Sequence, residues 1–388
     1  MRPSPLPDDA DRATLLARVE RPTLGPSVVA IRSGRAVDLT SPSAPTSSAL
    51  LERDDAAEYL ATAPGEDLGP IEAIAQNSFE GHRDASRPFL LAPVDLQAVK
   101  AAGVTFAVSL LERVIEEQAR GDAQKAEQLR EQIRAALGSD LARLRPGSEE
   151  AMELKRLLIA RGMWSQYLEV GIGTDPEVFT KAQPMSAVGF GANVGVPPFS
   201  HWNNPEPEVV LVANSRGGIR GAALGNDVNL RDVEGRSALL LGKAKDNNAQ
   251  AAIGPFVRVF DRHFTIDDVR GAVVGLTVRG EDGFELRGES SMRQISRDPV
   301  ALMAATMGAF HQYPDGVCLF LGTMFAPVQD RAGVGKGFTH QYGDRVEIRA
   351  PQLGCLANVV RATADCAPWT FGVGALMRSL ARRAVLLG

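Results

Sequence analysis

The sequence predicts an α+β fold that is mainly β. From about Tyr167 to the C-terminus, short apolar segments alternate with Gly-rich turns, which is typical of strands. Between Val94 and Leu168, apolar residues instead recur at steps of three and four among strong helix formers, most clearly in residues 122–137 and 148–161. A chain of 388 residues with 44% apolar content can bury a large core. We therefore expect a β-rich domain that carries a helical insertion.

The N-terminal region has a different pattern. Three alternating segments separated by turns predict a small antiparallel meander. These segments are residues 14–20, 27–32 and 36–40. A helical pattern follows over residues 49–63. We expect a small N-terminal α+β domain at residues 1–90 and a larger β-rich domain at residues 91–388, in which the helical insertion spans about residues 95–168 and acts as a lid or a subunit contact.

Composition excludes several classes of protein. The formal net charge of -5 and the absence of a basic cluster argue against a nucleic-acid partner. No apolar run approaches the length of a membrane span, and the N-terminus has no apolar stretch that could serve as a secretion signal. Cys318, Cys355 and Cys366 have no CxxC spacing, so we expect reduced thiols in a cytoplasmic protein.

A group of carboxylates carries the main functional signal. Glu206 and Glu208 lie two residues apart, so on a strand they share one face. Residues 214–218 predict a turn, and a hairpin about that turn would bring Asp227 within about a residue of the partner of Glu206. Three converging carboxylates need neutralisation, and an all-oxygen site suits Mg, Mn or Ca. A Glu-x-Glu pair by itself is more typical of solvated glutamates on an edge strand, with the Asp in a turn.

The surrounding residues resemble the core of the fumarylacetoacetate hydrolase family. Its pattern is a Glu-x-Glu strand, an Asn-Asp-Val-Ser-x-Arg-Asp turn and a lysine nine residues before Gly-Pro. The matching segments are Glu206-Pro207-Glu208, Asn226-Asp227-Val228-Asn229-Leu230-Arg231-Asp232, Lys245 and Gly254-Pro255. The resemblance implies that Glu206, Glu208 and Asp227 bind Mg or Mn, and that Lys245 lies beside the metal-bound substrate. Lys243 is a rival that lacks the spacing to Gly-Pro.

The resemblance also implies the architecture and two further contacts. The fold would be a mixed β-sandwich or roll, assembled as a homodimer or homotetramer. The family has Pro-x-x-Phe-x-Lys where this chain has residues 176–181, so Lys181 is expected to contact substrate. Glu177 shares a face with Lys181 and is either exposed or a proton-transfer group with a raised pKa. Thr323 stands in a segment similar to the family's Gly-Thr-Pro loop, which binds the substrate carboxylate.

One departure from the family pattern bears on the reaction. Hydrolases of the family carry Gly-x-Asn-Tyr-x-x-His-x-x-Glu, whose His–Glu pair activates water. In residues 103–112 of this chain, Ser109 stands in the position of that histidine and Glu112 in that of the glutamate. Because serine is a poor general base near neutral pH, hydrolysis is disfavoured and we expect Ser109 to contact substrate. If hydrolysis occurred, His201 or His340 would have to supply the base. Glu112 is either a functional residue, as in the family's His–Glu pair, or a solvated residue on a helix.

Other segments resemble the 2-keto-3-deoxy-pentonate dehydratases of this family. They are residues 225–236, 242–248, 311–316 and 368–371. The resemblance covers most of residues 90–388. It implies a Mg-dependent hydro-lyase that forms 2,5-dioxopentanoate in non-phosphorylating pentose catabolism, with Glu177 as first choice for the proton shuttle and Glu112 as second. The alternatives are an acylpyruvate-type hydrolase, an oxaloacetate-type decarboxylase and a non-catalytic binder of 2-oxo acids.

Overall fold

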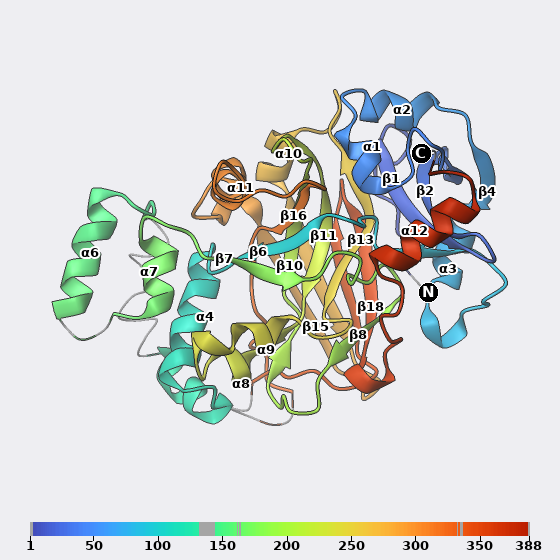
Figure 1. The fold of residues 1–388 in the computed structure, drawn as a ribbon. Coiled ribbons are helices and arrows are strands. Elements are labelled where there is room, and N and C mark those ends of the chain that lie inside the picture. The colour runs from blue at the N-terminus through green and yellow to red at the C-terminus, as the bar shows by residue number, and fades with distance from the viewer. Residues whose placement is uncertain are drawn as a thin grey trace.

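The computed structural model describes residues 3–131, 144–160, 162, 164–331, 333 and 337–386 (Figure 1). Two sheets form its centre, with the helical insertion on one side and the N-terminal elements on the other. The α+β, mainly β fold predicted from the sequence is confirmed.

The larger sheet has 11 strands within the described residues. Its strand order is β4 (Glu66–Pro70), β3 (Arg35–Asp38), β2 (Gly25–Arg32), β1 (Leu15–Arg21), β13 (Ala251–Val259), β11 (Ile219–Asp227), β10 (Pro207–Ala213), β16 (Val317–Phe320), β6 (Ala98–Ala102) and β7 (Val178–Ala182), with β5 (Phe89–Leu91) paired to β1. The predicted N-terminal meander is confirmed as β1–β3. It continues the large sheet because β1 pairs with β13, where Leu15 lies opposite Arg258. The division of the chain into two domains near residue 90 stays a prediction.

The second sheet packs against the first. Its order is β15 (Glu285–Ser291), β14 (Val273–Arg279), β17 (Arg345–Ala350), β18 (Gly354–Ala362) and β8 (Asn193–Val196). The main core lies between the sheets, where Leu211 of β10 belongs to the same buried cluster as Leu276 of β14 and Leu356 of β18. The opposite face of β10 is also covered: Val210 and Val212 belong to a second cluster with Leu50. Because β10 is buried on both faces, its apolar run is continuous rather than alternating.

Helices cover the sheet edges and ends. The predicted pattern over residues 49–63 corresponds to α1 (Ser47–Glu52) and α2 (Ala56–Thr62). The remaining helices outside the insertion are α3 (Ile71–Asn77), α8 (Arg231–Glu234), α9 (Leu241–Lys245), α10 (Ile266–Gly271), α11 (Pro299–Thr306) and α12 (Val373–Arg382). A two-stranded pair joins β9 (Asn203–Asn204), which precedes β10 in the chain, to β12 (Asn229–Leu230), which follows β11 and leads into α8. Among the described residues, no helix is long and apolar enough to cross a membrane.

The helical insertion contains α4 (Ala107–Gln118), α6 (Glu149–Ala160) and α7 (Gln166–Ile172). The helix predicted over residues 148–161 is thus confirmed as α6, except that residue 161 lies outside the described residues. Of the helix predicted over residues 122–137, residues 123–131 are helical and the rest lies outside the described residues. Leu110 of α4 and Leu168 of α7 share a buried cluster, which packs these two helices together (Figure 1).

Candidate active site

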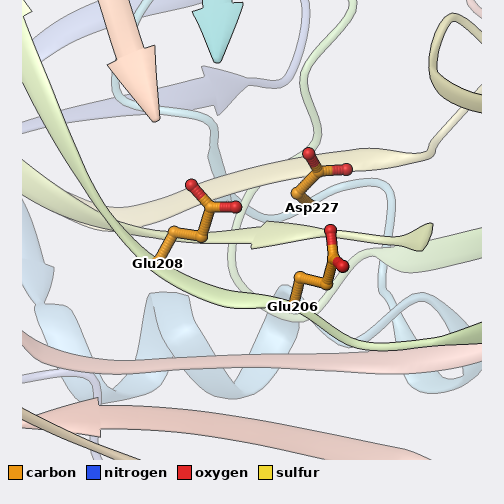
Figure 2. Close-up of side chains that lie close together, drawn as sticks. All are labelled: Glu206, Glu208 and Asp227. Atoms are coloured by element: carbon orange, nitrogen blue, oxygen red, sulfur yellow. The ribbon is translucent and has the colours of Figure 1, made fainter. Parts of the chain in front are cut away.

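The hairpin β10–β11 brings three carboxylates together. Its register pairs Pro207 with Asn226, and the Asp227 amide donates to the Glu206 carbonyl at 3.0 Å. One ligand atom from each of Glu206, Glu208 and Asp227 lies within 4.8 Å of the others, and all three side chains are buried (Figure 2). The predicted convergence is therefore confirmed.

The loop after β16 holds the Glu208 carboxylate in place. The Gly322 amide donates to Glu208 Oε2 at 2.7 Å, and the Thr323 hydroxyl lies 3.4 Å from Glu208 Oε1. Gly322 has a φ of +105°, and a Cβ there would lie 2.0 Å from Thr105 Oγ1. Only glycine therefore fits at this position, which aims the backbone amide at the carboxylate.

Two lysines lie against the cluster from different sides. Lys245 Nζ lies 3.2 Å from Glu206 Oε2, 3.0 Å from Asp227 Oδ1 and 3.1 Å from Glu234 Oε1. Burial alone would lower the pKa of Lys245, but these carboxylates hold it well above its usual value. Lys181 Nζ lies 2.8 Å from Asp227 Oδ1 and does not line the cavity described below. Lys243 is exposed and contacts the Phe199 ring, so Lys245 is the lysine at the cluster.

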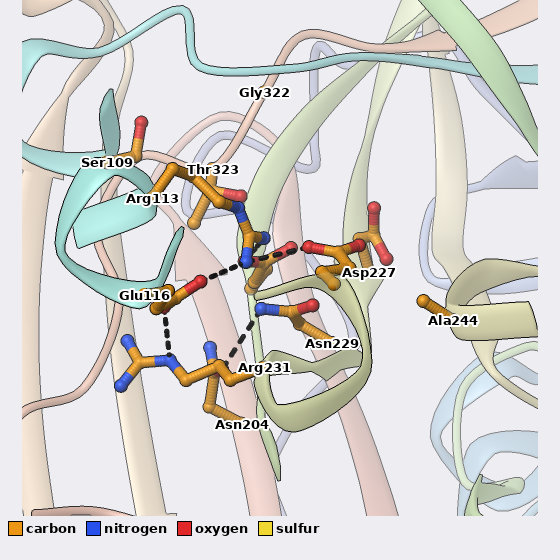
Figure 3. Close-up of polar contacts among 12 residues, drawn as sticks. Ser109, Arg113, Glu116, Asn204, Asp227, Asn229, Arg231, Ala244, Gly322 and Thr323 are labelled. Atoms are coloured by element: carbon orange, nitrogen blue, oxygen red, sulfur yellow. Dashed lines mark hydrogen bonds and ion pairs between the residues drawn. The ribbon is translucent and has the colours of Figure 1, made fainter. Parts of the chain in front are cut away.

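An arginine that the sequence reasoning missed completes the cluster. Arg113 of α4 places Nη2 2.8 Å from Glu206 Oε1 and Nη1 2.7 Å from Glu234 Oε2. The same Nη1 lies 2.5 Å from Glu116, whose other oxygen lies 3.0 Å from Arg231 Nε (Figure 3). Helical spacing was the available signal, because Arg113 lies one turn beyond Ser109 on the same face of α4.

The charges of the whole cluster fit a divalent cation. Six buried or partly buried carboxylates and four cations take part, so the formal charge is -2 when all are ionised. The carboxylates are Glu116, Glu177, Glu206, Glu208, Asp227 and Glu234, and the cations are Arg113, Lys181, Arg231 and Lys245. Burial and the charges of Asp227 and Glu206 raise the pKa of Glu208 well above its usual value. A bound divalent ion would remove that penalty, since it adds two positive charges where three oxygens already converge.

A small cavity of about 30 Å³ adjoins the cluster. Glu206, Glu208 and Asp227, which line it, are each at most 2% exposed, so their carboxylates are largely shielded from bulk water. Glu177 lines it, close to the backbone of Gly103, where a Cβ would lie 1.8 Å from Glu177 Oε2. Burial, followed by the charge of Glu234, raises the pKa of Glu177 to about 7, against the opposing effect of Arg113 and Lys245. A carboxyl group with this pKa can both take up and release a proton near neutral pH.

The other residues singled out from the sequence divide between the cavity and its surroundings. Ser109 and Thr323 line the cavity. Glu112 does not; its carboxylate lies 2.9 Å from Arg130 Nη2 in a buried ion pair. This pairing argues against the solvated position considered for Glu112, since only 2% of the residue is exposed.

The two histidines considered as alternative bases lie away from the cavity. His201 is exposed on a loop. His340 is buried with Nδ1 3.4 Å from Asp344 Oδ2, and burial lowers its pKa. Neither is among the described residues that line the cavity.

Comparisons with known proteins found one similar family model and two similar curated proteins. Residues 169–361 match the family model described as "Fumarylacetoacetate (FAA) hydrolase C-terminal". The chain is 30% identical over 198 residues to a "Probable 2-keto-3-deoxyxylonate dehydratase" of Haloferax volcanii, covering 51% of this chain and 64% of that protein. It is 29% identical over 195 residues to a "2-dehydro-3-deoxy-D-arabinonate dehydratase" of Saccharolobus solfataricus, covering 50% and 62%. The matches thus span less than two thirds of either relative.

Solved structures give the same fold. A "2-keto-3-deoxy-D-arabinonate dehydratase apo form" matches with a TM-score of 0.62 at 19% identity, over 90% of this chain and 99% of that one. A structure of the same dehydratase "complexed with magnesium and 2,5-dioxopentanoate" matches with a TM-score of 0.61 at 19% identity and the same coverage. At these identities the likeness establishes the fold.

Proposed function

We propose that this chain, whose residues 169–361 match the fumarylacetoacetate hydrolase family model, is a Mg-dependent dehydratase of 2-keto-3-deoxy-pentonates. A substrate such as 2-keto-3-deoxy-D-xylonate would lose one water and give 2,5-dioxopentanoate. The names of the two curated relatives support this choice, as does the ligand named for one solved structure.

The proposed metal ligands are Glu206, Glu208 and Asp227, with Mg, or Mn in its place. Their convergence within 4.8 Å and the surplus negative charge around them support this assignment. When bound, the ion supplies Lewis-acid polarisation of a 2-oxo acid, which acidifies the hydrogens on carbon 3. We propose that the Thr323 hydroxyl binds the substrate carboxylate and that Lys181 fixes Asp227 from outside the cavity.

Glu177 is the proposed proton shuttle. As a carboxylate it takes a proton from carbon 3, and as a carboxylic acid it returns that proton to the hydroxyl that leaves carbon 4 as water. In the unsaturated 5-hydroxy product a proton then moves from carbon 5 to carbon 3. The resulting enol transfers its hydroxyl proton to carbon 4, so that carbon 5 becomes an aldehyde. The Lys245 ammonium stabilises the negative charge that develops on the 2-oxo oxygen. Glu112 remains the second choice, although its ion pair with Arg130 and its position outside the cavity favour Glu177.

One observation carries the choice of elimination over hydrolysis. Among the described residues, those that line the cavity include no histidine, and Ser109 lies at the position of the water-activating histidine. The Ser109 hydroxyl donates to the Phe106 carbonyl at 2.9 Å, so its proton is already committed. Elimination needs only a carboxylate beside carbon 3, which Glu177 can supply.

A product assay separates the candidate reactions. Purified protein with Mg is incubated with 2-keto-3-deoxy-D-xylonate, an acylpyruvate and oxaloacetate in separate reactions. Release of 2,5-dioxopentanoate from the first substrate alone supports the proposal. Pyruvate together with a second acid would identify a hydrolase, carbon dioxide would identify a decarboxylase, and Mg-dependent binding without turnover of any 2-oxo acid would identify a binder.

We also propose that the protein works in the cytoplasm as a homodimer or homotetramer. The three cysteines are buried free thiols, which suits a reducing compartment. Exposed Trp369, Val373 and Met377 on or next to α12 offer an apolar surface for a symmetric contact.

A further inference from the structure

The charges that line the cavity limit what substrate it can accept. Five carboxylates and two cations line it, giving a formal charge of -3 when all are ionised. The carboxylates are Glu177, Glu206, Glu208, Asp227 and Glu234, and the cations are Arg113 and Lys245. A divalent ion would leave a charge of -1. If the adjacent Lys181 is also counted, the charge with a divalent ion bound is zero. In either count no positive charge is left over to balance a second carboxylate of a ligand.

The two cations are already engaged by protein carboxylates. Arg113 lies within 2.8 Å of oxygens from Glu116, Glu206 and Glu234. Lys245 contacts three carboxylates, including Glu234. Both side chains already have anionic partners, so a second carboxylate of a ligand would have to compete with protein carboxylates for them.

The Glu234 side chain is held in place by these two cations. It is 4% exposed, lies on α8 and is held between Arg113 and Lys245. Its Oε1 is buried without a well-directed hydrogen bond, although it lies 3.1 Å from the Lys245 ammonium. The 2-oxo acid end of a substrate belongs at the three-carboxylate cluster, which leaves Glu234 and Glu177 as the carboxylates that meet the rest of the substrate.

Neutral polar groups line the same cavity. The Ser109 hydroxyl uses its hydrogen on the Phe106 carbonyl, so its lone pairs remain to accept from a ligand. Ser237 Oγ accepts from the Leu239 amide, so its hydrogen remains to donate. Alcohol groups both donate and accept hydrogen bonds, so they suit a cavity that offers an acceptor at Ser109 and a donor at Ser237.

We propose that this cavity selects 2-oxo acids with one carboxylate and a neutral hydroxylated tail, and that Glu234 is a specificity-determining residue that rejects a second carboxylate. The inference rests on the proposed function and deepens it. Like charges brought together in a site shielded from water repel strongly, whereas a hydroxyl adds no charge. The same side chain would accept a hydrogen bond from the tail.

Two ligands of equal chain length test the proposal. Both 5-hydroxy-2-oxopentanoate and 2-oxoglutarate are five-carbon 2-oxo acids, and they differ in a terminal alcohol against a carboxylate. Calorimetric titration into the Mg-loaded protein should give at least about tenfold tighter binding of the alcohol, equivalent to about 1.4 kcal/mol. Equal or tighter binding of 2-oxoglutarate by the wild-type protein would overturn the proposal.

Three variants and one control variant assign the preference to charge. Glu234→Gln should reduce the preference at least about fivefold, while Glu234→Asp, which keeps the charge, should retain most of it. Glu177→Gln, measured in parallel, should also reduce it, so the test survives if Glu234→Gln fails to fold. Glu289→Gln, an equal change at an exposed residue of β15, should leave it unaltered. An undiminished preference in folded Glu234→Gln would refute the role of Glu234.

The outcome is distinguishable from failure of the proposed reaction. A protein that prefers the alcohol but releases no 2,5-dioxopentanoate from 2-keto-3-deoxy-pentonates would retain the selectivity and lose the proposed reaction. A protein that performs the dehydration but binds 2-oxoglutarate equally well would lose only the selectivity.

Discussion

Replacing Glu208 with glutamine should weaken metal binding and stabilise the metal-free protein at the same time. Glutamine keeps the shape of the side chain and can still accept from the Gly322 amide, so the loop after β16 is retained. What is lost is one negative charge within 4.8 Å of Glu206 and Asp227. The two consequences have opposite signs, and this separates a cation site from a structural ion-pair cluster.

The magnitudes follow from the distances. Two like charges about 4.8 Å apart repel by roughly 3 kcal/mol at an effective dielectric constant of about 20. Protonation of Glu208 relieves part of this cost, because its pKa is raised by burial and by its neighbours, so we expect a gain of about 1–2 kcal/mol in the unfolding free energy of the metal-free variant. Loss of a ligand carboxylate should weaken Mg binding at least about 100-fold, since changes outside the ligand set already cost about 10–100-fold.

The sign of the pH dependence gives an additional check. A carboxyl group whose pKa is raised on folding favours the folded state below its unfolded pKa, near 4.3, and that contribution is lost as pH rises through the folded pKa. The metal-free wild-type protein should therefore lose stability as pH rises above about 4.3, and Glu208→Gln should reduce the slope.

Two measurements decide this prediction. Calorimetric titration with Mg gives the affinity, and urea unfolding in EDTA gives the stability of the metal-free protein. Glu289→Gln, at an exposed position on β15, serves as the control for the chemical change. Unaltered Mg affinity in Glu208→Gln, or a metal-free variant less stable than wild type, would refute the reasoning.

Three further predictions concern the reaction and the assembly. If deprotonated Glu177 removes the proton from carbon 3, kcat/KM for dehydration should fall as pH decreases below about 7, and Glu177→Gln should lose about 10²–10⁴ in rate together with that pH limb; a wild-type profile retained in the variant would point to another base. The Ser109→His variant should acquire weak acylpyruvate hydrolysis while retaining Mg binding. Ordinary hydrolytic rates in the wild-type protein would show that hydrolysis does not need a histidine in the cavity. Light scattering at micromolar concentration should report a dimer or tetramer, and a monomer would contradict the assembly.

The sequence predicted the hairpin and the carboxylate cluster because both depend on local rules. Strand periodicity placed Glu206 and Glu208 on one face, and the turn at residues 214–218 set the register that brings Asp227 opposite. The Asn214 side chain accepts from the Gly218 amide at 2.9 Å, so the turn is fixed by residues within it. Local chemistry was sufficient to predict this part of the site.

The other charged side chains in and around the cavity are brought together by packing between helices and strands, which the sequence does not show. Arg113 reaches Glu206 because α4 packs against α7 and lies beside α8. Helical spacing puts Arg113 on the same face as Ser109, but it does not show which distant segments that face meets. Glu234 was part of a recognised segment but had no predicted role, since its position beside Lys245 depends on how α8 and α9 fold back onto the hairpin. For the same reason the sequence could not show that Glu112 pairs with Arg130.

The central claim is that a metal held by Glu206, Glu208 and Asp227 enables dehydration of a 2-keto-3-deoxy-pentonate. Its most direct test follows 2-keto-3-deoxy-D-xylonate by NMR while Mg is titrated into protein first treated with EDTA. We predict that 2,5-dioxopentanoate forms only when Mg is added, and that its initial rate rises in proportion to the Mg occupancy measured by calorimetry. Formation of the product at full rate in EDTA, or an unchanged substrate at saturating Mg, would contradict the account.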